Sequence, residues 1–429
     1  MDPIQERLNH LTRRTFLGQT ARGVGGLALG TMLFPDLLAA SKGKREGGLG
    51  GIPHFAPKAK RILCLFQSGG LSHVDLFDHK PMLKQMAGKD LPPSVKGTQR
   101  LTGMTSGQGS YPCTPSLKDG KLCGKNGLWI SDLLPHLQTV ADEMCFIKSL
   151  HTEAINHDPA ITFMNTGNQL PGYASMGAWA SYGLGTENAN LPAFIAMVSQ
   201  GTGKNPGQPV FSRLWGSGFL PASHQGVGLR PGANPVLYLD NPPGVERTQR
   251  RAQLDDLAKL NHQRADELGD PETLARIDAY EMAFRMQTSV PELTDFSNEP
   301  QSTWDLYGPK AKEPGTFAYN CLMARRLAER GVRFTQIFLR SWDQHSNLPK
   351  NIKLMAEESD QPSYALVTDL KRRGLLDETL VIWGGEFGRT CYSQGVLSRE
   401  NYGRDHHPRC FTMWMAGGGV KPGFSYGET

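Results

Sequence analysis

Short apolar runs alternate with amphipathic stretches along most of the chain, which is the pattern of an α/β protein. Strands are expected where apolar residues run together and a glycine or polar turn follows. Helices are expected where apolar residues recur every three or four positions. The expected strands are 61–67, 144–150, 193–198, 332–339, 379–383 and 410–416, and the expected helices are 129–141, 316–330 and 363–373. This alternation predicts a mostly parallel central sheet with helices on both faces.

Polar clusters follow four of the expected strands, at residues 68–78, 151–158, 341–347 and 384–389. In open α/β sheets, ligands bind outside the carboxyl ends of the strands. We therefore expect these clusters to meet in space although they are far apart in the sequence.

The N-terminal segment has the features of a targeting signal. Arg13 and Arg14 precede a weakly apolar run, 24–38, and the small residues 39–41. Twin arginines in this order predict a Tat signal at residues 1–41, although an ordinary amphipathic helix is an alternative. The mature protein would then be periplasmic or on the cell surface. No later run has the ~20 apolar residues of a transmembrane segment.

The rest of the chain is expected to form one domain, 61–429, after a Gly- and Lys-rich linker at 42–60. A charged, helix-rich insertion is expected near 243–310, with a break between two helices at 270–272. The chain ends soon after a strand and a glycine turn, so we expect that a final element could be missing. The sequence leaves the oligomeric state open.

Composition narrows the possible partners. The 429 residues carry a formal charge of only +5 and no basic block, so no nucleic-acid partner is expected. The seven cysteines cannot all pair within the chain. Cys113 and Cys123 flank a loop and could form one disulfide outside the cytoplasm. A redox role for the unpaired cysteine is a weaker possibility.

Carboxylates and imidazoles gather near the C-terminal end, and these side chains are typical ligands of divalent metals. Asp343 and His345 follow one expected strand, and Glu386 follows another. His406 and His407 are adjacent, so we expect one to bind metal while the other orients or packs. The alternatives are a solvated turn for Asp343 and His345, a structural ion pair with Arg389 for Glu386, and an exposed polar loop for 405–407.

Two further clusters could complete such a site. Asp75 or His73, after the first strand, could add a ligand. His157, after the second, could be a ligand or a general acid/base. Asn156 and Arg389 are the candidates for contacting an anionic group of a substrate.

Five motifs spread over residues 61–428 resemble those of an exported bacterial family known as domain of unknown function 1501. They are GGLSHVDLFDHKP, NHDPAITFMNTGNQLPG, SWDQHSN, GGEFGRT and GRDHHP. The order of elements is similar to the alkaline-phosphatase and sulfatase superfamily. This resemblance implies an alkaline-phosphatase-like three-layer α/β/α fold. It also implies hydrolysis of small-molecule or glycan phosphate or sulfate esters at a site for zinc, calcium or magnesium.

The chain departs from the superfamily pattern in three places. Ser68 and Gly69 replace the acid that follows the first strand. The sulfatase Cys-x-Pro-x-Arg signature falls on 157–161, where the proline is kept and the nucleophile and arginine are absent. Glu386 and Phe387 stand in place of an Asp-His pair. We therefore expect either a metal-dependent ester hydrolase or a non-catalytic binding or surface protein with a degenerate site.

Overall fold

The structure is a computed structural model, which describes residues 56–201, 210–232, 234–268, 271–398 and 400–429. The expected signal segment and the first part of the linker, 42–55, lie outside these residues. Contacts divide the chain into two units. The larger unit consists of Ala59–Asp240 and Met282–Thr429 and contains the central sheet.

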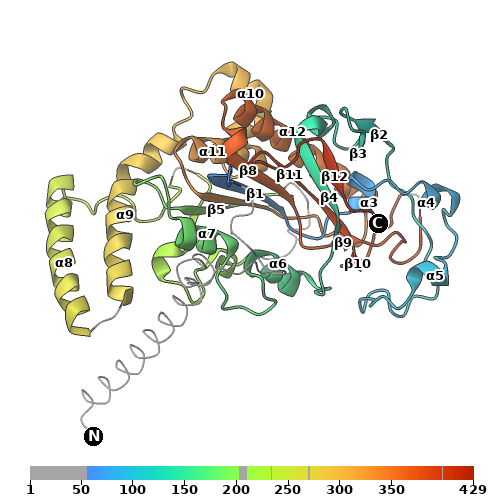
Figure 1. Cartoon of the computed structure of the whole chain (residues 1–429), viewed down its shortest axis with the longest axis horizontal. Coiled ribbons are helices and arrows are strands. Elements are labelled where there is room, and N and C mark those ends of the chain that lie inside the picture. The colour runs from blue at the N-terminus through green and yellow to red at the C-terminus, as the bar shows by residue number, and fades with distance from the viewer. Residues whose placement is uncertain (1–55, 202–209, 233, 269–270, 399) are drawn as a thin grey trace, which may run out of the picture. The chain divides into compact units, whose positions relative to one another are not determined.

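Eight strands form the central sheet, in the order β12-β4-β11-β8-β1-β7-β5-β6 (Figure 1). Strand β11 is antiparallel to both of its neighbours, whereas the other pairs are parallel. The mostly parallel sheet is therefore confirmed. The strands are β1 (Arg61–Gln67), β4 (Met144–Leu150), β5 (Phe194–Ser199), β6 (Val227–Leu229), β7 (Phe334–Leu339), β8 (Thr379–Gly384), β11 (Phe411–Ala416) and β12 (Phe424–Tyr426).

Helices cover both faces of this sheet (Figure 1). The alternating side chains of β1 show the two layers of core, because successive residues of a strand point to opposite faces. Leu63 and Leu65 belong to the main hydrophobic cluster together with α11 (Phe317–Glu329) and α12 (Leu348–Arg372). Cys64 and Phe66 belong to a second cluster with Ile161 of α6. On that face lie α6 (His157–Thr166) and α7 (Met176–Leu184).

Shorter elements connect these layers. They are α3 (His73–Leu76), α4 (Pro81–Gln85), α5 (Pro93–Lys96), α10 (Gln301–Tyr307), β2 (Gly120–Cys123), β3 (Leu128–Ser131), β9 (Gly388–Arg389), β10 (His406–His407) and the 3-10 helices η1 (Leu137–Glu143), η2 (Ser212–Trp215), η3 (Ala222–His224), η4 (Pro309–Lys312) and η5 (Leu376–Glu378).

Two of the expected helices are different in the structure. Residues 129–141 do not form one helix: β3 pairs with β2 as a hairpin, and η1 follows after Pro135. Proline lacks the backbone N–H that a helix interior needs, which separates the two elements. The helix expected at 363–373 is longer, because α12 starts at Leu348 and continues through Pro362.

The helices α8 (Arg247–Leu268) and α9 (Pro271–Thr294) lie within the expected insertion, with the break between them where the sequence indicates it. The smaller unit includes Asn241–Glu281. Within it, Arg251 of α8 forms an ion pair with Glu281 of α9 (2.5 Å), which ties the two helices together, and another with Asp255 of its own helix (2.8 Å). The bounds of the insertion as a separate domain remain a prediction.

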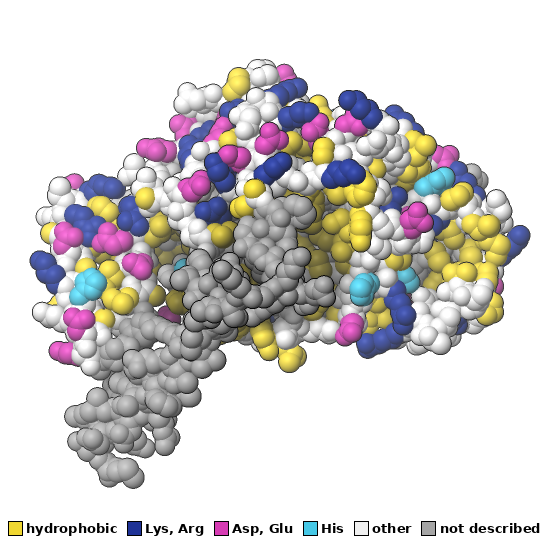
Figure 2. Space-filling model, in the orientation of Figure 1, with side chains coloured by type: hydrophobic (Ala, Val, Ile, Leu, Met, Phe, Trp, Pro, Cys, Tyr) yellow, Lys and Arg dark blue, Asp and Glu magenta, His cyan; other side chains and the backbone are white. Residues whose placement is uncertain are grey.

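The cysteines are free thiols, including Cys113 and Cys123. The disulfide considered for this pair is absent because the two side chains pack in different hydrophobic clusters. None of the described helices has the length and apolarity needed to cross a bilayer. On the face shown in Figure 2, basic and acidic side chains are interspersed rather than gathered by sign.

Candidate metal centre

The polar clusters meet at one edge of the sheet. Strands β1, β4, β7 and β8 run in the same direction, so their carboxyl ends share this edge. Strand β11 runs the opposite way, which brings the residues before it, including His406, to the same place. Loops after β4 and β7 supply His157, Asp343 and His345.

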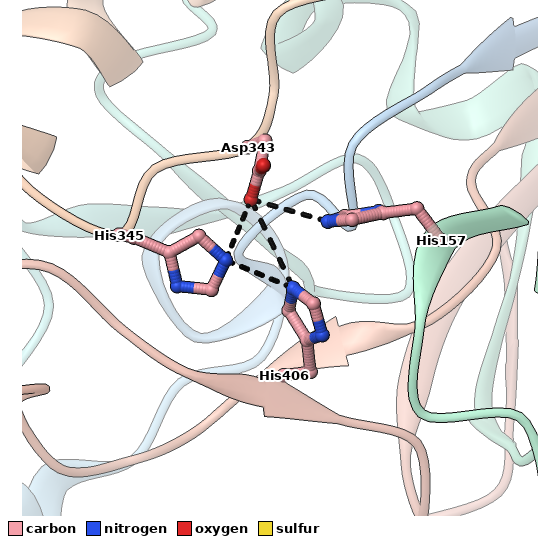
Figure 3. Close-up of side chains that lie close together, drawn as sticks. All are labelled: His157, Asp343, His345 and His406. Atoms are coloured by element: carbon pink, nitrogen blue, oxygen red, sulfur yellow. Dashed lines mark hydrogen bonds and ion pairs between the residues drawn. The ribbon is translucent and has the colours of Figure 1, made fainter. Parts of the chain in front are cut away.

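Four side chains point at one another there (Figure 3). Ligand atoms of His157, Asp343, His345 and His406 all lie within 4.8 Å of one another. Oδ1 of Asp343 lies 2.9 Å from Nε2 of His345, 3.2 Å from Nε2 of His157 and 3.8 Å from Nε2 of His406. Three imidazoles and one carboxylate therefore face a common point.

A buried carboxylate sets the orientation of His157. Glu386 is fully buried, and its Oε1 accepts hydrogen bonds from Nδ1 of His157 (2.7 Å) and from the backbone N–H of Gly69 (2.9 Å). With the proton on Nδ1, the lone pair of Nε2 points into the cluster. Glu386 thus orients a candidate ligand, and it lies outside the group of four that could hold the metal.

The other two imidazoles are oriented in the same way. Nδ1 of His406 lies 2.6 Å from the carbonyl oxygen of Ile155, and Nδ1 of His345 lies 2.6 Å from Oε1 of Gln394. Both acceptors favour a proton on Nδ1 and a lone pair on Nε2. The Nε2 atoms of His345 and His406 lie 2.9 Å apart.

This arrangement fits a cation better than an empty cluster. Lone pairs on the Nε2 atoms would face one another and the Asp343 carboxylate, and they repel unless a proton or metal ion lies between them. Nε2 of His157 is buried without a hydrogen-bond partner among the described residues. An ion bound by the four side chains would satisfy all these atoms.

The protonation states of His406 and Asp343 also suit metal binding, whereas the carboxylates of Asp343 and Glu386 outweigh burial and raise the pKa of His157. Burial lowers the pKa of His406 to about 4, which leaves its imidazole neutral at pH 7. Burial alone would raise the pKa of Asp343, but the three facing histidines and the charge of Arg389 outweigh it and hold this pKa well below its usual range. A neutral imidazole and an ionised carboxylate are the forms that bind metals.

Arg389 is a structural partner of the cluster. Its Nη2 donates to Oδ1 of Asp343 (2.7 Å), and its Nε donates to the carbonyl of Gly70 (2.6 Å). Nη1 donates to the carbonyl of Arg404 (3.0 Å) and faces Nε2 of His345 at 3.4 Å. The guanidinium is thus directed at groups of the protein. This differs from the expected role of contacting an anionic substrate.

Gly69 brings the first strand close to these residues. Its φ of +121° is disfavoured for other residues, and an added Cβ would lie 2.5 Å from the backbone nitrogen of Asp343. Gly69 therefore allows the close approach of the loop after β7.

Two expected ligands lie elsewhere. Both oxygens of the buried Asp75 are engaged: Oδ2 pairs with Arg404 (2.8 Å), and Oδ1 accepts from the backbone of Leu117 (2.8 Å). His407 follows His406 in a short strand, so its side chain points to the opposite face. There it lines a surface cavity with Arg409. Both residues are therefore left out of the ligand set.

Asn156 is exposed and precedes α6 without capping it through its side chain. The neighbouring Asp405 is also structural, because its carboxylate accepts hydrogen bonds from the hydroxyls of Thr102 and Thr105. Gln394, Ile155 and this threonine pair are partners of the site that no sequence pattern indicates. Their segments carry no periodic pattern that would have placed them beside the cluster.

The fold and the donor set define an α/β protein with a candidate metal centre at the carboxyl edge of its sheet. The chain belongs to the family described as protein of unknown function (DUF1501), whose model matches residues 59–429. A search of curated proteins finds no match.

Several solved structures are similar to this chain at low identity. One is a variant of the alkaline phosphatase from the Antarctic bacterium TAB5 with Mg bound, at 12% identity and a TM-score of 0.34, covering 87% of this chain and 95% of that one. Another is Ps i-CgsB in complex with k-i-k-neocarrahexaose, at 10% identity and a TM-score of 0.34, covering 86% of this chain and 68% of that one. A third is a phosphonate monoester hydrolase from Silicibacter pomeroyi, at 10% identity and a TM-score of 0.27, covering 68% of this chain and 65% of that one.

We predict that His345→Ala loses metal while His407→Ala keeps it. Removing one of four converging ligands should weaken binding by more than the ~10–100-fold that loss of an orienting partner costs. The measurement is metal content by mass spectrometry after dialysis, with binding of added Zn²⁺ by calorimetry. Equal loss in both variants, or no binding in the wild type, would contradict the ligand assignment.

Proposed function

We propose that the chain is an exported, metal-dependent hydrolase of phosphate or sulfate esters. The observation that carries the proposal is the convergence of His157, Asp343, His345 and His406 at the edge where α/β sheets bind ligands. The resemblance of the motifs to the alkaline-phosphatase and sulfatase superfamily supports the same reaction class.

The donor set narrows the expected metal. Imidazole nitrogens suit zinc and other transition metals, whereas calcium and magnesium prefer oxygen ligands. Three imidazoles and one carboxylate therefore favour zinc among the three metals expected from the resemblance. When bound, such an ion would supply Lewis acidity to an ester oxygen.

The residues of the chain set the access and the protonation at the centre. The side chain of His345 is 21% exposed and those of His157 and His406 are nearly buried, so an ester would approach past His345. Glu386 keeps the proton of His157 on Nδ1. The attacking group would be water, because the four converging side chains include no hydroxyl or thiol.

This proposal changes the role expected for His157. An imidazole whose Nε2 holds a metal cannot also exchange a proton at that atom. We therefore assign His157 as a ligand rather than as the general acid/base. Asn156 remains a predicted substrate contact, because it is exposed directly beside His157.

A second candidate is a non-catalytic binding or surface protein that uses the metal for structure. Four protein ligands are typical of structural zinc sites, whereas catalytic sites keep an open position. The group of four and its burial favour this alternative. The two candidates differ in whether metal supports turnover or only stability.

The hydrolase should act on at least one of p-nitrophenyl phosphate, p-nitrophenyl sulfate and p-nitrophenyl phenylphosphonate when loaded with Zn²⁺. A chelator should abolish turnover. His345→Ala should lower kcat/KM by about 100-fold or more, as loss of a transition-state contact does. His407→Ala is the matched control and should keep its rate. Stoichiometric metal without turnover on the three esters, and a lower Tm after chelation, would support the structural candidate instead.

We also propose that residues 1–41 direct export through the Tat pathway, since a twin-arginine pair precedes the apolar run. Replacing Arg13 and Arg14 with lysine should retain the protein in the cytoplasm, as measured by cell fractionation and immunoblotting. Arg22→Lys is a matched change outside the pair, and this variant should be exported like the wild type. Export of both variants to the same extent would refute the assignment.

A further inference from the structure

Helices α6 and α7 cover one face of the sheet (Figure 1). A row of five rings, four of them exposed and one half-buried, lies on α7 and the neighbouring segments. We name it the aromatic strip: Tyr173, Trp179, Tyr182, Phe219 and His224. Exposed fractions are 44% for Tyr173, 44% for Trp179, 45% for Tyr182 and 63% for Phe219. Exposed apolar groups gathered in this way mark interaction sites more often than scattered ones.

The rings hold one another in place by edge-to-face contacts. Phe219 lies between Tyr173 (centroids 6.3 Å apart) and Trp179 (5.6 Å). The row continues from Trp179 to Tyr182 (6.1 Å) and from Tyr182 to His224 (5.3 Å). Such pairs stabilise the geometry of each ring, so a partner would meet a surface that is already ordered.

The segments that carry the strip contain no charged side chain. Asp, Glu, Lys and Arg are absent from 159–186 and from 214–229, although they make up 20% of the chain. Burial lowers the pKa of His224, which keeps this ring neutral. The strip therefore has no formal charge with which to form an ion pair, and it fits a neutral partner.

The strip also offers polar edges. Tyr173 and Tyr182 are 44% and 45% exposed, and their hydroxyls can donate and accept hydrogen bonds. A purely apolar partner would bury these hydroxyls without compensation, which is unfavourable. A sugar ring matches both features, because its C–H face stacks on an aromatic ring while its hydroxyls form hydrogen bonds.

The strip is connected to the candidate metal centre. Helix α6 begins at His157 of the centre, and the chain passes from its C-terminus to Tyr173. A helix of this length spans about 15 Å. The segment that carries Phe219 and His224 is tied to the start of α6 by an ion pair between Arg213 and Asp158.

We propose that the aromatic strip binds the neutral sugars of a glycan chain whose ester group reaches the metal centre. The part of the proposal that concerns the ester rests on the function proposed above. The part that concerns sugar binding stands on the strip alone.

Affinity gel electrophoresis with soluble neutral polysaccharides (xylan, mannan, galactan and mixed-linkage β-glucan) tests the proposal. The wild type should be retarded by at least one of them. Trp179→Ala and Phe219→Ala should each weaken that retardation at least tenfold. Tyr426→Ala is the matched control, because it removes from β12 a ring as exposed as that of Phe219. This variant should be retarded like the wild type.

The outcomes separate the strip from the metal centre. His345→Ala should keep retardation and lose hydrolysis, so a failure of the hydrolase proposal would leave sugar binding intact. No retardation by any of the four polysaccharides, or equal retardation of Trp179→Ala, would overturn the proposal. It would also be overturned if light scattering showed that Trp179→Ala turns a dimer into a monomer. Loss of co-sedimentation with phosphatidylcholine vesicles in that variant would likewise overturn it.

Discussion

One oxygen of Asp343 organises the edge of the sheet. Oδ1 faces the Nε2 atoms of His157, His345 and His406 and accepts a hydrogen bond from the guanidinium of Arg389. These side chains come from loops after β4, β7 and β8 and from the residues before β11. Segments separated by more than 200 residues therefore share one buried negative charge, which would be costly without these partners.

Burial and orientation give this cluster its chemical character. Each imidazole has an acceptor on Nδ1, so each directs Nε2 inward. A divalent ion would lie between atoms that already point at it, so little reorganisation is needed on binding. The burial of these side chains also limits the access of a substrate to the centre. The donor set is therefore compatible with a structural role as well as with a catalytic one.

Much of the fold could be predicted from the sequence because it depends on local patterns. The apolar runs at 61–67, 144–150 and 379–383 became strands with nearly the expected bounds. The rule that ligands bind at carboxyl ends placed Asp343 and His345 at the correct edge. The helix expected at 129–141 was wrong because apolar spacing alone does not distinguish a short buried strand from a helix.

The partners within the site could not be predicted, because they depend on strand direction and on contacts between distant segments. Whether His406 or His407 faces inward is set by the pairing of β10 with β9. Asp75 resembled a ligand in the sequence, but Arg404, 329 positions away, is its partner. Glu386 reads equally well as a ligand or as a ligand's partner until His157 is seen beside it.

X-ray absorption at the zinc K-edge of the zinc-loaded protein tests the central claim most directly. The account predicts nitrogen and oxygen neighbours at ~2.0–2.1 Å, with multiple scattering from three imidazoles and no sulfur. A sulfur neighbour at ~2.3 Å, fewer imidazoles, or zinc that is lost on desalting would contradict it.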